Sequence, residues 1–281
     1  MSDNLFSYFP GCSLATTAKE NNASLYNVVQ ELGIGLVELE DWNCCGSSSA
    51  HSIDATLADQ LAMRNLYLAP PDRPLLIACP SCNLRLRGAN IKLQTDASAR
   101  RRYEELFGRP ANADLEILHF FELLDRIDWK KINKVRGGTL NNLKFAPYYG
   151  CMLARPPAMK QMQNYHGLME KILSGLGATP ISWGYGARCC GTFLSVVRPD
   201  VVGSLVRQII GHAKQGRADC IVTACAMCHM NLEIRGDPKN TLPVFHFSEI
   251  LSLAFGHADA DAYFARHLID PRPMLKRCRL M

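Results

Sequence analysis

The sequence contains a short apolar run that ends on two cysteines, Leu75-Leu76-Ile77-Ala78-Cys79-Pro80-Ser81-Cys82. A second run repeats this pattern in the later half of the chain, Ile221-Val222-Thr223-Ala224-Cys225-Ala226-Met227-Cys228. Compact apolar or β-branched runs of this length are typical of strands that are buried in a parallel sheet. Each pair of cysteines is therefore predicted to follow the carboxyl end of a strand.

Upstream of both runs, further cysteines complete two matched sets of five. The first set is Cys12, then Cys44-Cys45-Gly46, then Cys79 and Cys82; the second is Cys151, then Cys189-Cys190-Gly191, then Cys225 and Cys228. A similar segment closes each half, since His119-Phe120-Phe121-Glu122-Leu123-Leu124 corresponds to His246-Phe247-Ser248-Glu249-Ile250-Leu251. Duplication of a domain explains this repeat. We expect domains at residues 1–130 and 143–281 with a linker at about 131–142, where glycines and asparagines gather.

Between the cysteines, the apolar periodicity alternates between that of helices and that of strands. Helical stripes are predicted at three places: Leu25, Val28, Val29 and Leu32 before a stop at Gly33; Leu57, Leu61 and Leu68; and Val202, Leu205, Val206 and Ile209. A short strand is expected from Leu36 and Val37 toward Trp42. This alternation predicts an α/β fold of two pseudo-symmetric Rossmann-like halves, each a mainly parallel sheet with flanking helices. The cysteines would then gather in the loops at the carboxyl ends of the strands.

Composition and charge narrow the classes of function. The chain has 281 residues, 48% of them hydrophobic, and a net charge of +5. Its basic runs, at 100–102 and 130–136, accompany no nucleic-acid-binding motif, so we expect solvated surfaces or contacts with an acidic protein, and no nucleic acid. No apolar run approaches the roughly 18 residues of a membrane span, and the first residues do not have the pattern of a signal peptide. A soluble, cytoplasmic protein is expected.

Twelve cysteines in such a chain favour metal or redox chemistry over structural disulfides. A structural zinc ion takes four ligands, and an ordinary [4Fe–4S] cubane takes four cysteines. Five thiolates suit a larger or rearranged iron–sulfur core. Zinc in one half with a cluster in the other remains an alternative, as do disulfides. Cys220 is expected to be a small buried residue and Cys278 an incidental thiol.

The repeated Cys…Cys-Cys-Gly…Cys-x-x-Cys arrangement resembles the cysteine-rich CCG domain. Two tandem copies resemble the B subunit of heterodisulfide reductase, from Tyr8 to about Leu251. The stretch Asp41-Trp42-Asn43-Cys44-Cys45-Gly46 is similar to that family and to its relatives in the heterodisulfide reductase-like complex of sulfur-oxidising bacteria. The resemblance implies a noncubane [4Fe–4S] cluster in each half. The implied ligands are Cys12, Cys44, Cys45, Cys79 and Cys82 for the first cluster, and Cys151, Cys189, Cys190, Cys225 and Cys228 for the second.

The same resemblance implies an oxidoreductase that acts on sulfur groups. Its clusters would cleave or form an S–S bond in a disulfide, thiol or lipoate-bound sulfur substrate, as the catalytic subunit of a complex. The chain has no C-x2-C-x2-C-x3-C-P run, so we expect a separate ferredoxin-like iron–sulfur partner, of the C-subunit type, and a flavoprotein partner, of the A-subunit type. Among nearby polar residues, His51, Arg188, His212 and His229 are weak candidates to position a thiolate or to supply a proton, and a structural role is open for each.

Two other functions fit the cysteine pattern. One is an electron-relay subunit of a glycolate-, lactate- or succinate-type oxidoreductase, in which related domains occur. The other is a zinc-binding structural subunit. A cavity open to substrate between the two sites would favour catalysis, whereas shielded clusters would favour relay.

Overall fold

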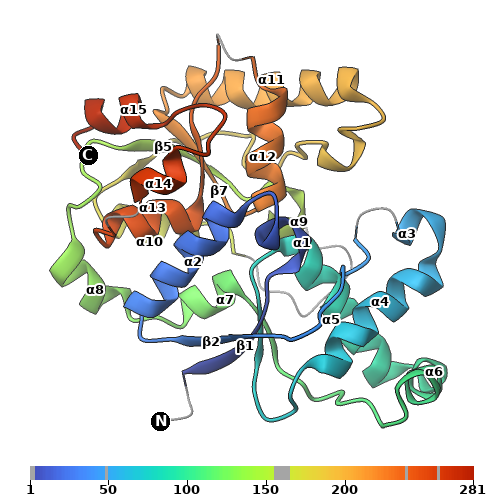
Figure 1. Cartoon of the computed structure of the whole chain (residues 1–281). Coiled ribbons are helices and arrows are strands. Elements are labelled where there is room, and N and C mark those ends of the chain that lie inside the picture. Colours follow the sequence, from blue (N-terminus) through green and yellow to red (C-terminus); the bar gives the residue numbers. More distant parts are fainter. Residues whose placement is uncertain (1–3, 48–49, 155–164, 238–239, 258–259) are drawn as a thin grey trace.

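A computed structural model describes residues 4–47, 50–154, 165–237, 240–257 and 260–281 as two four-stranded sheets flanked by helices (Figure 1). The first sheet has the order β2-β1-β3-β4 and the second the order β6-β5-β7-β8, and every pairing is parallel. The strands of the first sheet are β1 (Leu5–Phe9), β2 (Gly35–Glu38), β3 (Leu75–Ile77) and β4 (Ile117–His119). Those of the second are β5 (Lys144–Tyr148), β6 (Thr179–Pro180), β7 (Cys220–Thr223) and β8 (Val244–His246). The predicted α/β architecture of two Rossmann-like halves is confirmed.

Helices connect the strands in both halves. The first half contains α1 (Gly11–Ala15), α2 (Lys19–Glu31), α3 (Ala50–Ile53), α4 (Ala55–Leu68), α5 (Pro80–Thr95), α6 (Ala97–Phe107), α7 (Phe120–Asp125) and α8 (Trp129–Arg136). The second contains α9 (Gly150–Ala154), α10 (Leu168–Gly175), the 3-10 turn η1 (Thr192–Leu194), α11 (Pro199–Gln215), α12 (Ala226–Arg235), α13 (Phe247–Ala254), α14 (Ala260–Phe264) and α15 (Arg272–Arg277). Corresponding elements follow the same order, as expected for a duplicated domain.

The predicted helical stripes lie in helices, with one change of face. In α2, Leu25 and Val28 are buried, and Gly33 follows with a φ of +69°, as the stop predicts. Helix α4 forms where expected, but Leu57 is exposed. The buried face of α4 is shifted by one residue from the predicted leucines and contains smaller side chains: Ala58, Ala62, Met63 and Leu66. Leucine spacing alone does not reveal that α4 packs against α5 through small side chains.

The second strand is shorter than its apolar pattern suggests. It ends at Glu38 and does not reach Trp42. The Trp42 ring instead packs edge-on against Phe9, with 5.5 Å between the ring centroids, and its Nε1–H donates to Glu38 Oε1 at 2.8 Å. The tryptophan covers the end of the sheet beside the first cysteine pair.

One apolar core runs through both halves. It joins Leu25 and Val28 of α2 to Ile250 and Leu251 of α13, and each half has a smaller core of its own that includes three or more of its cysteines. The division at 1–130 and 143–281 stays a prediction. The predicted linker at 131–142 contains most of α8 and then a turn in which Gly138 and Asn142 have positive φ.

Candidate functional site

The five cysteines of the first half meet at one edge of the sheet. Cys12 lies in α1 directly after β1, the adjacent pair follows β2, and Cys79 and Cys82 stand at the start of α5 after β3. In a parallel sheet of this strand order, the crossover direction reverses between β1 and β3, and a crevice opens outside the carboxyl ends there. All five line one small hollow: Cys12, Cys44, Cys45, Cys79 and Cys82.

The second half repeats this arrangement. Its own small hollow is lined by Cys151, Cys189, Cys190, Cys225 and Cys228. The Sγ atoms of Cys190 and Cys228 lie 3.3 Å apart. The structure thus brings together both of the cysteine sets predicted from the sequence, each within its own half.

Glycines next to the cysteines allow the backbone to approach the sulfur atoms. Gly46 and Gly191 have φ values of +78° and +80°, and their N–H groups donate to Cys44 Sγ at 3.4 Å and to Cys189 Sγ at 3.3 Å. A Cβ on Gly11, which has a φ of +74°, would lie 2.8 Å from Cys82 Sγ. Positive φ is needed at both pairs, which explains the glycine after each of them.

Crowding of the thiols perturbs their pKa values. Hydrogen bonding from Cys82 lowers the pKa of Cys79 to about 7, and hydrogen bonding from Cys151 lowers that of Cys189 to about 6. Hydrogen bonds to other thiols are the main cause that raises the pKa of Cys82 and of Cys228, with burial adding to it. Each hollow therefore has a thiolate position stabilised by neighbouring S–H groups, and a bound cationic core would favour deprotonation of the remaining thiols.

The donor set and its surroundings fit an iron–sulfur cluster. Soft thiolates bind iron–sulfur cores, backbone N–H groups already point at two of the sulfurs, and the buried cysteines belong to apolar cores. Cys220 and Cys278 are buried away from the two hollows, and Cys278 Sγ lies 3.7 Å from Met274 Sδ. Both are small core residues in the structure.

A third, larger cavity adjoins the two hollows. It has a volume of about 560 Å³ and shares Ser81 and Phe193 with both of them. The halves meet here because α5 packs against α9 and α1 against α12 (Figure 1). The residues that line it come from both halves: Ser47, His51, Ser52, Ser81, Leu84, Arg85, Gly88, Met152, Phe193 and Leu194.

The four polar residues that the sequence offered as candidates lie in different parts of the structure. His51 lines the large cavity, with its ring centroid 6.4 Å from that of Phe193. Arg188 lies over the ring of Tyr185, and His212 stacks on that same ring at 3.8 Å. His229 is 3% exposed and contacts Asn21 and Glu233. Of these four candidates, only His51 is among the lining residues of the three cavities.

Sequence reasoning missed the residues that connect the two halves. Arg85 and Phe193 line the large cavity, and Met227 lines both hollows. Arg85 forms no ion pair with another described residue. Its position, three residues after Cys82 on the same helix, is a signal that it could face the site. Nothing in the sequence around Phe193 indicates its position between the hollows.

Comparison with known proteins identifies the family. The model of the CCG cysteine-rich domain matches twice, at residues 6–87 and 145–233. The chain belongs to the CCG cysteine-rich domain family. The two matches contain all ten cysteines of the two sets, and the prediction of tandem CCG domains like those of the heterodisulfide reductase B subunit is confirmed.

The chain is similar over most of its length to subunits of several oxidoreductases. It is 29% identical to the 8-methylmenaquinol:fumarate reductase membrane anchor subunit of Wolinella succinogenes, over 94% of this chain and 97% of that protein. It is 26% identical to the B subunit of the ferredoxin/F(420)H(2)-dependent CoB-CoM heterodisulfide reductase of Methanosarcina acetivorans, over 89% of each chain. Among the described residues, no helix is long and apolar enough to cross a membrane.

A solved structure supports the fold. A hypothetical protein from Helicobacter pylori superposes with a TM-score of 0.72 at 12% identity, over 95% of this chain. The chain spans about half of that protein, 52%.

Proposed function

We propose that this chain is the iron–sulfur subunit of a heterodisulfide reductase-like complex and that it cleaves or forms S–S bonds. The observation that carries the proposal is the large cavity, which shares walls with both cysteine hollows. A relay subunit has no need of a solvent-open space at that place. The similarity to heterodisulfide reductase B subunits supports the same function.

In this proposal each hollow holds one noncubane [4Fe–4S] cluster on its five cysteines. When bound, the two clusters would supply the two electrons that a disulfide requires, one each. The overall step is R–S–S–R′ + 2e⁻ + 2H⁺ → R–SH + R′–SH, or its reverse. Zinc in one half is the alternative that metal analysis distinguishes.

Residues of the large cavity would bind and orient the sulfur substrate. The Arg85 guanidinium, which has no carboxylate partner among the described residues, is suited to a thiolate or to the anionic group of a substrate. The His51 imidazole lies in the same lining and can accept or donate the proton of the thiol. Phe193 and Leu194 provide an apolar wall that limits access of water.

The substrate and partners follow from the same proposal. A disulfide or a lipoate- or protein-bound persulfide fits the sulfur chemistry, and a sulfur-oxidiser complex would run the reaction oxidatively. Two partners, one ferredoxin-like and one flavoprotein, would carry the electrons, because this sequence lacks a ferredoxin motif of its own.

The test begins with metal content after anaerobic purification. We expect about eight iron atoms per chain, as two four-iron clusters require. Cys45→Ser or Cys190→Ser should lose about half of the iron, whereas Cys220→Ser, at a buried cysteine outside both hollows, should lose none. Zinc without iron contradicts the proposal.

The second measurement is electron paramagnetic resonance during titration with thiol. Substrate thiol should change the cluster signal, and Arg85→Leu should raise the concentration required about tenfold or more, since it removes a charged hydrogen-bond donor. Arg101→Leu is the matched control, because Arg101 is exposed on α6 and lies outside the lining of all three cavities. A signal that responds to an electron donor but not to any thiol contradicts disulfide chemistry.

That last outcome would support a second function, electron relay in a reductase of the quinol:fumarate type. The 29% identity to the Wolinella succinogenes protein over almost its whole length favours this candidate. Under it, the clusters would respond to a quinol-linked donor, and Arg85→Leu would leave electron transfer unchanged.

A further inference from the structure

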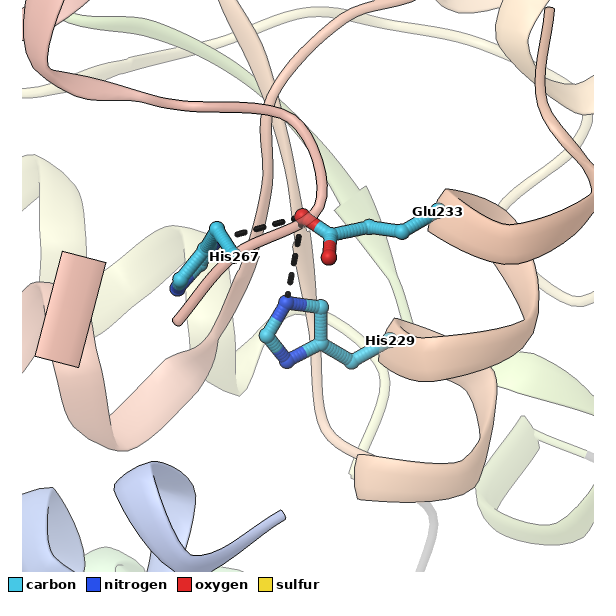
Figure 2. A group of neighbouring side chains, drawn as sticks. All are labelled: His229, Glu233 and His267. Carbon is cyan, nitrogen blue, oxygen red and sulfur yellow. Dashed lines mark hydrogen bonds and ion pairs between the residues drawn. The ribbon is translucent and has the colours of Figure 1, made fainter. Parts of the chain in front are cut away.

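A buried group of polar side chains lies behind the second hollow. His229 and Glu233 stand one turn apart on α12, and His267 reaches them from the segment after α14 (Figure 2). His229 and Glu233 are 3% and 7% exposed, and the side chain of His267 is fully buried. The three side chains point toward one another, and none of them lines the cysteine hollow.

The two halves differ in charge at this place. In the first half, Arg87 follows Cys82 by five residues and pairs with Glu122, which caps α7. In the second half, the residue five positions after Cys228 is Glu233, and the capping carboxylate of α13 is Glu249. A buried pair of zero net charge is thus replaced by two buried carboxylates.

Two buried carboxylates require compensating positive charge. His267 bridges them, with Nδ1 at 3.1 Å from Glu233 Oε1 and Nε2 at 3.0 Å from Glu249 Oε1. With one proton on His267, the two carboxylates and the imidazoles together have a net charge of −1. A divalent cation bound by neutral imidazoles would bring the net charge to zero.

The ligand atoms are oriented as in a metal site. The backbone N–H of Leu268 donates to Glu233 Oε2 at 2.9 Å, so that Oε1 faces the two imidazoles. His229 Nε2 lies 3.6 Å from that oxygen and is buried without a hydrogen-bond partner among the described residues. Its Nδ1 faces the side-chain amide of Asn21, 3.1 Å from Nδ2 and 3.3 Å from Oδ1. Behind the His267 ring, the Glu249 carboxylate is an acceptor, which is the usual support of a metal-binding histidine. Behind the His229 ring, the Asn21 amide would serve in the same way with its oxygen turned toward Nδ1.

We propose that His229, Glu233 and His267 bind one divalent cation of the zinc type, separate from the cysteine sites. The three ligand atoms lie within 4.8 Å of one another. In a tetrahedron with metal–ligand distances of about 2.1 Å, the ligands would be about 3.4 Å apart, so only a small closure of the two histidines is needed. Two imidazoles and one carboxylate suit zinc better than the all-oxygen cations, and a water would complete the tetrahedron.

Such a cation would hold the carboxyl-terminal segment on α12. It would link His267 to the helix that begins directly after Cys225, while Asn21 connects the same group to α2 of the first half. The role is structural, and it does not depend on the proposed disulfide chemistry.

The test uses the anaerobically purified chain from zinc-replete cells, with zinc and iron measured by mass spectrometry. We expect about one zinc per chain, and X-ray absorption at the zinc edge should show only nitrogen and oxygen ligands at about 2.0–2.1 Å. His267→Gln and Glu233→Gln should reduce zinc more than tenfold and leave the iron content unchanged. His212→Gln, on α11 and outside this group, should keep both metals.

Three results would overturn the proposal. The first is wild-type protein without zinc even after dialysis against excess zinc ion. The second is zinc with sulfur ligands at about 2.3 Å, which would place it in a cysteine hollow. The third is zinc that persists in both folded variants. X-ray absorption and the number of zinc ions per chain are both measured on the wild-type protein. The proposal therefore stays testable if a variant fails to fold.

Discussion

Gly11 and Gly33 provide a matched pair of glycines near the start of the chain. Both have positive φ, +74° and +69°, but a Cβ would clash with Cys82 Sγ only at Gly11. Alanine should cost about 1–2 kcal/mol of unfolding free energy at either position, because the left-handed conformation is strained. Gly11→Ala should in addition lower the iron content of the first hollow, which iron analysis and denaturant unfolding would measure. Equal iron in both variants contradicts a cluster held close to this backbone.

His119 and His246 are buried residues that cap α7 and α13 in their neutral form. Burial lowers the pKa of His119 to about 3 and that of His246 to about 4. Below the unfolded-state pKa of about 6.5, the unfolded chain binds protons that the folded chain does not, so stability falls as pH falls from there toward 4.

His119→Asn should therefore flatten this pH dependence. Asparagine can still cap the helix, and the slope of unfolding free energy should decrease by up to about 1.4 kcal/mol per pH unit between pH 6.5 and 4. Urea unfolding at several pH values measures it. An unchanged slope would mean that His119 also takes up a proton in the folded protein.

At the scale of residues, the sequence predicts which cysteines come together, but not which other side chains lie beside them. The ten cysteines could be grouped because an unusual residue type recurs at matched spacing, and parallel strands bring such loops together. Arg85 and Phe193 could not be placed, because their position depends on how the two halves pack, and no local pattern records that contact.

At the scale of elements, Arg87 joins α5 to the start of α7. Its guanidinium pairs with Glu122 and donates to the carbonyl of Ile117, and both side chains are largely buried. Arg87→Gln should lower the unfolding free energy by about 3 kcal/mol, because Glu122 would be left without its counter-charge.

The double variant Arg87→Gln/Glu122→Gln should cost less than the two single changes together, since no buried charge remains unpaired. Urea unfolding of the four proteins gives the comparison. Strict additivity would mean that the pair is not coupled.

Elements were predictable where periodicity was strong. The long stripe of α11 and the apolar runs of β3 and β7 are examples, because a continuous pattern fixes both type and place. The end of β2 was not predictable, because Trp42 turns back onto Phe9 through a tertiary contact. In α8, Trp129 is buried and donates its indole N–H to the carbonyl oxygen of Leu124. The polar residues that surround Trp129 in the sequence give no indication of this burial.

At the scale of the whole molecule, the shared core predicts that the halves unfold together. Phe247 is fully buried in that core, and its ring lies 5.0 Å from Phe121 of the first half. Phe247→Ala should cost about 3–5 kcal/mol, with one transition seen by all probes. Val135→Ala, at an exposed position, should stay within about 0.5 kcal/mol of the wild type. Two separate transitions would show that the halves are independent.

The packing of α2 against α13 also sets an order of events during translation. Ser24 of α2 hydrogen-bonds to Ser248 at 2.7 Å, and Leu25 and Val28 share a core with Ile250. The ribosome adds roughly 5–20 residues per second, so the partner helix is made on the order of 10–45 s after α2. During that interval an apolar face of the nascent chain has no native cover, so it is exposed to aggregation until the second half has been synthesised.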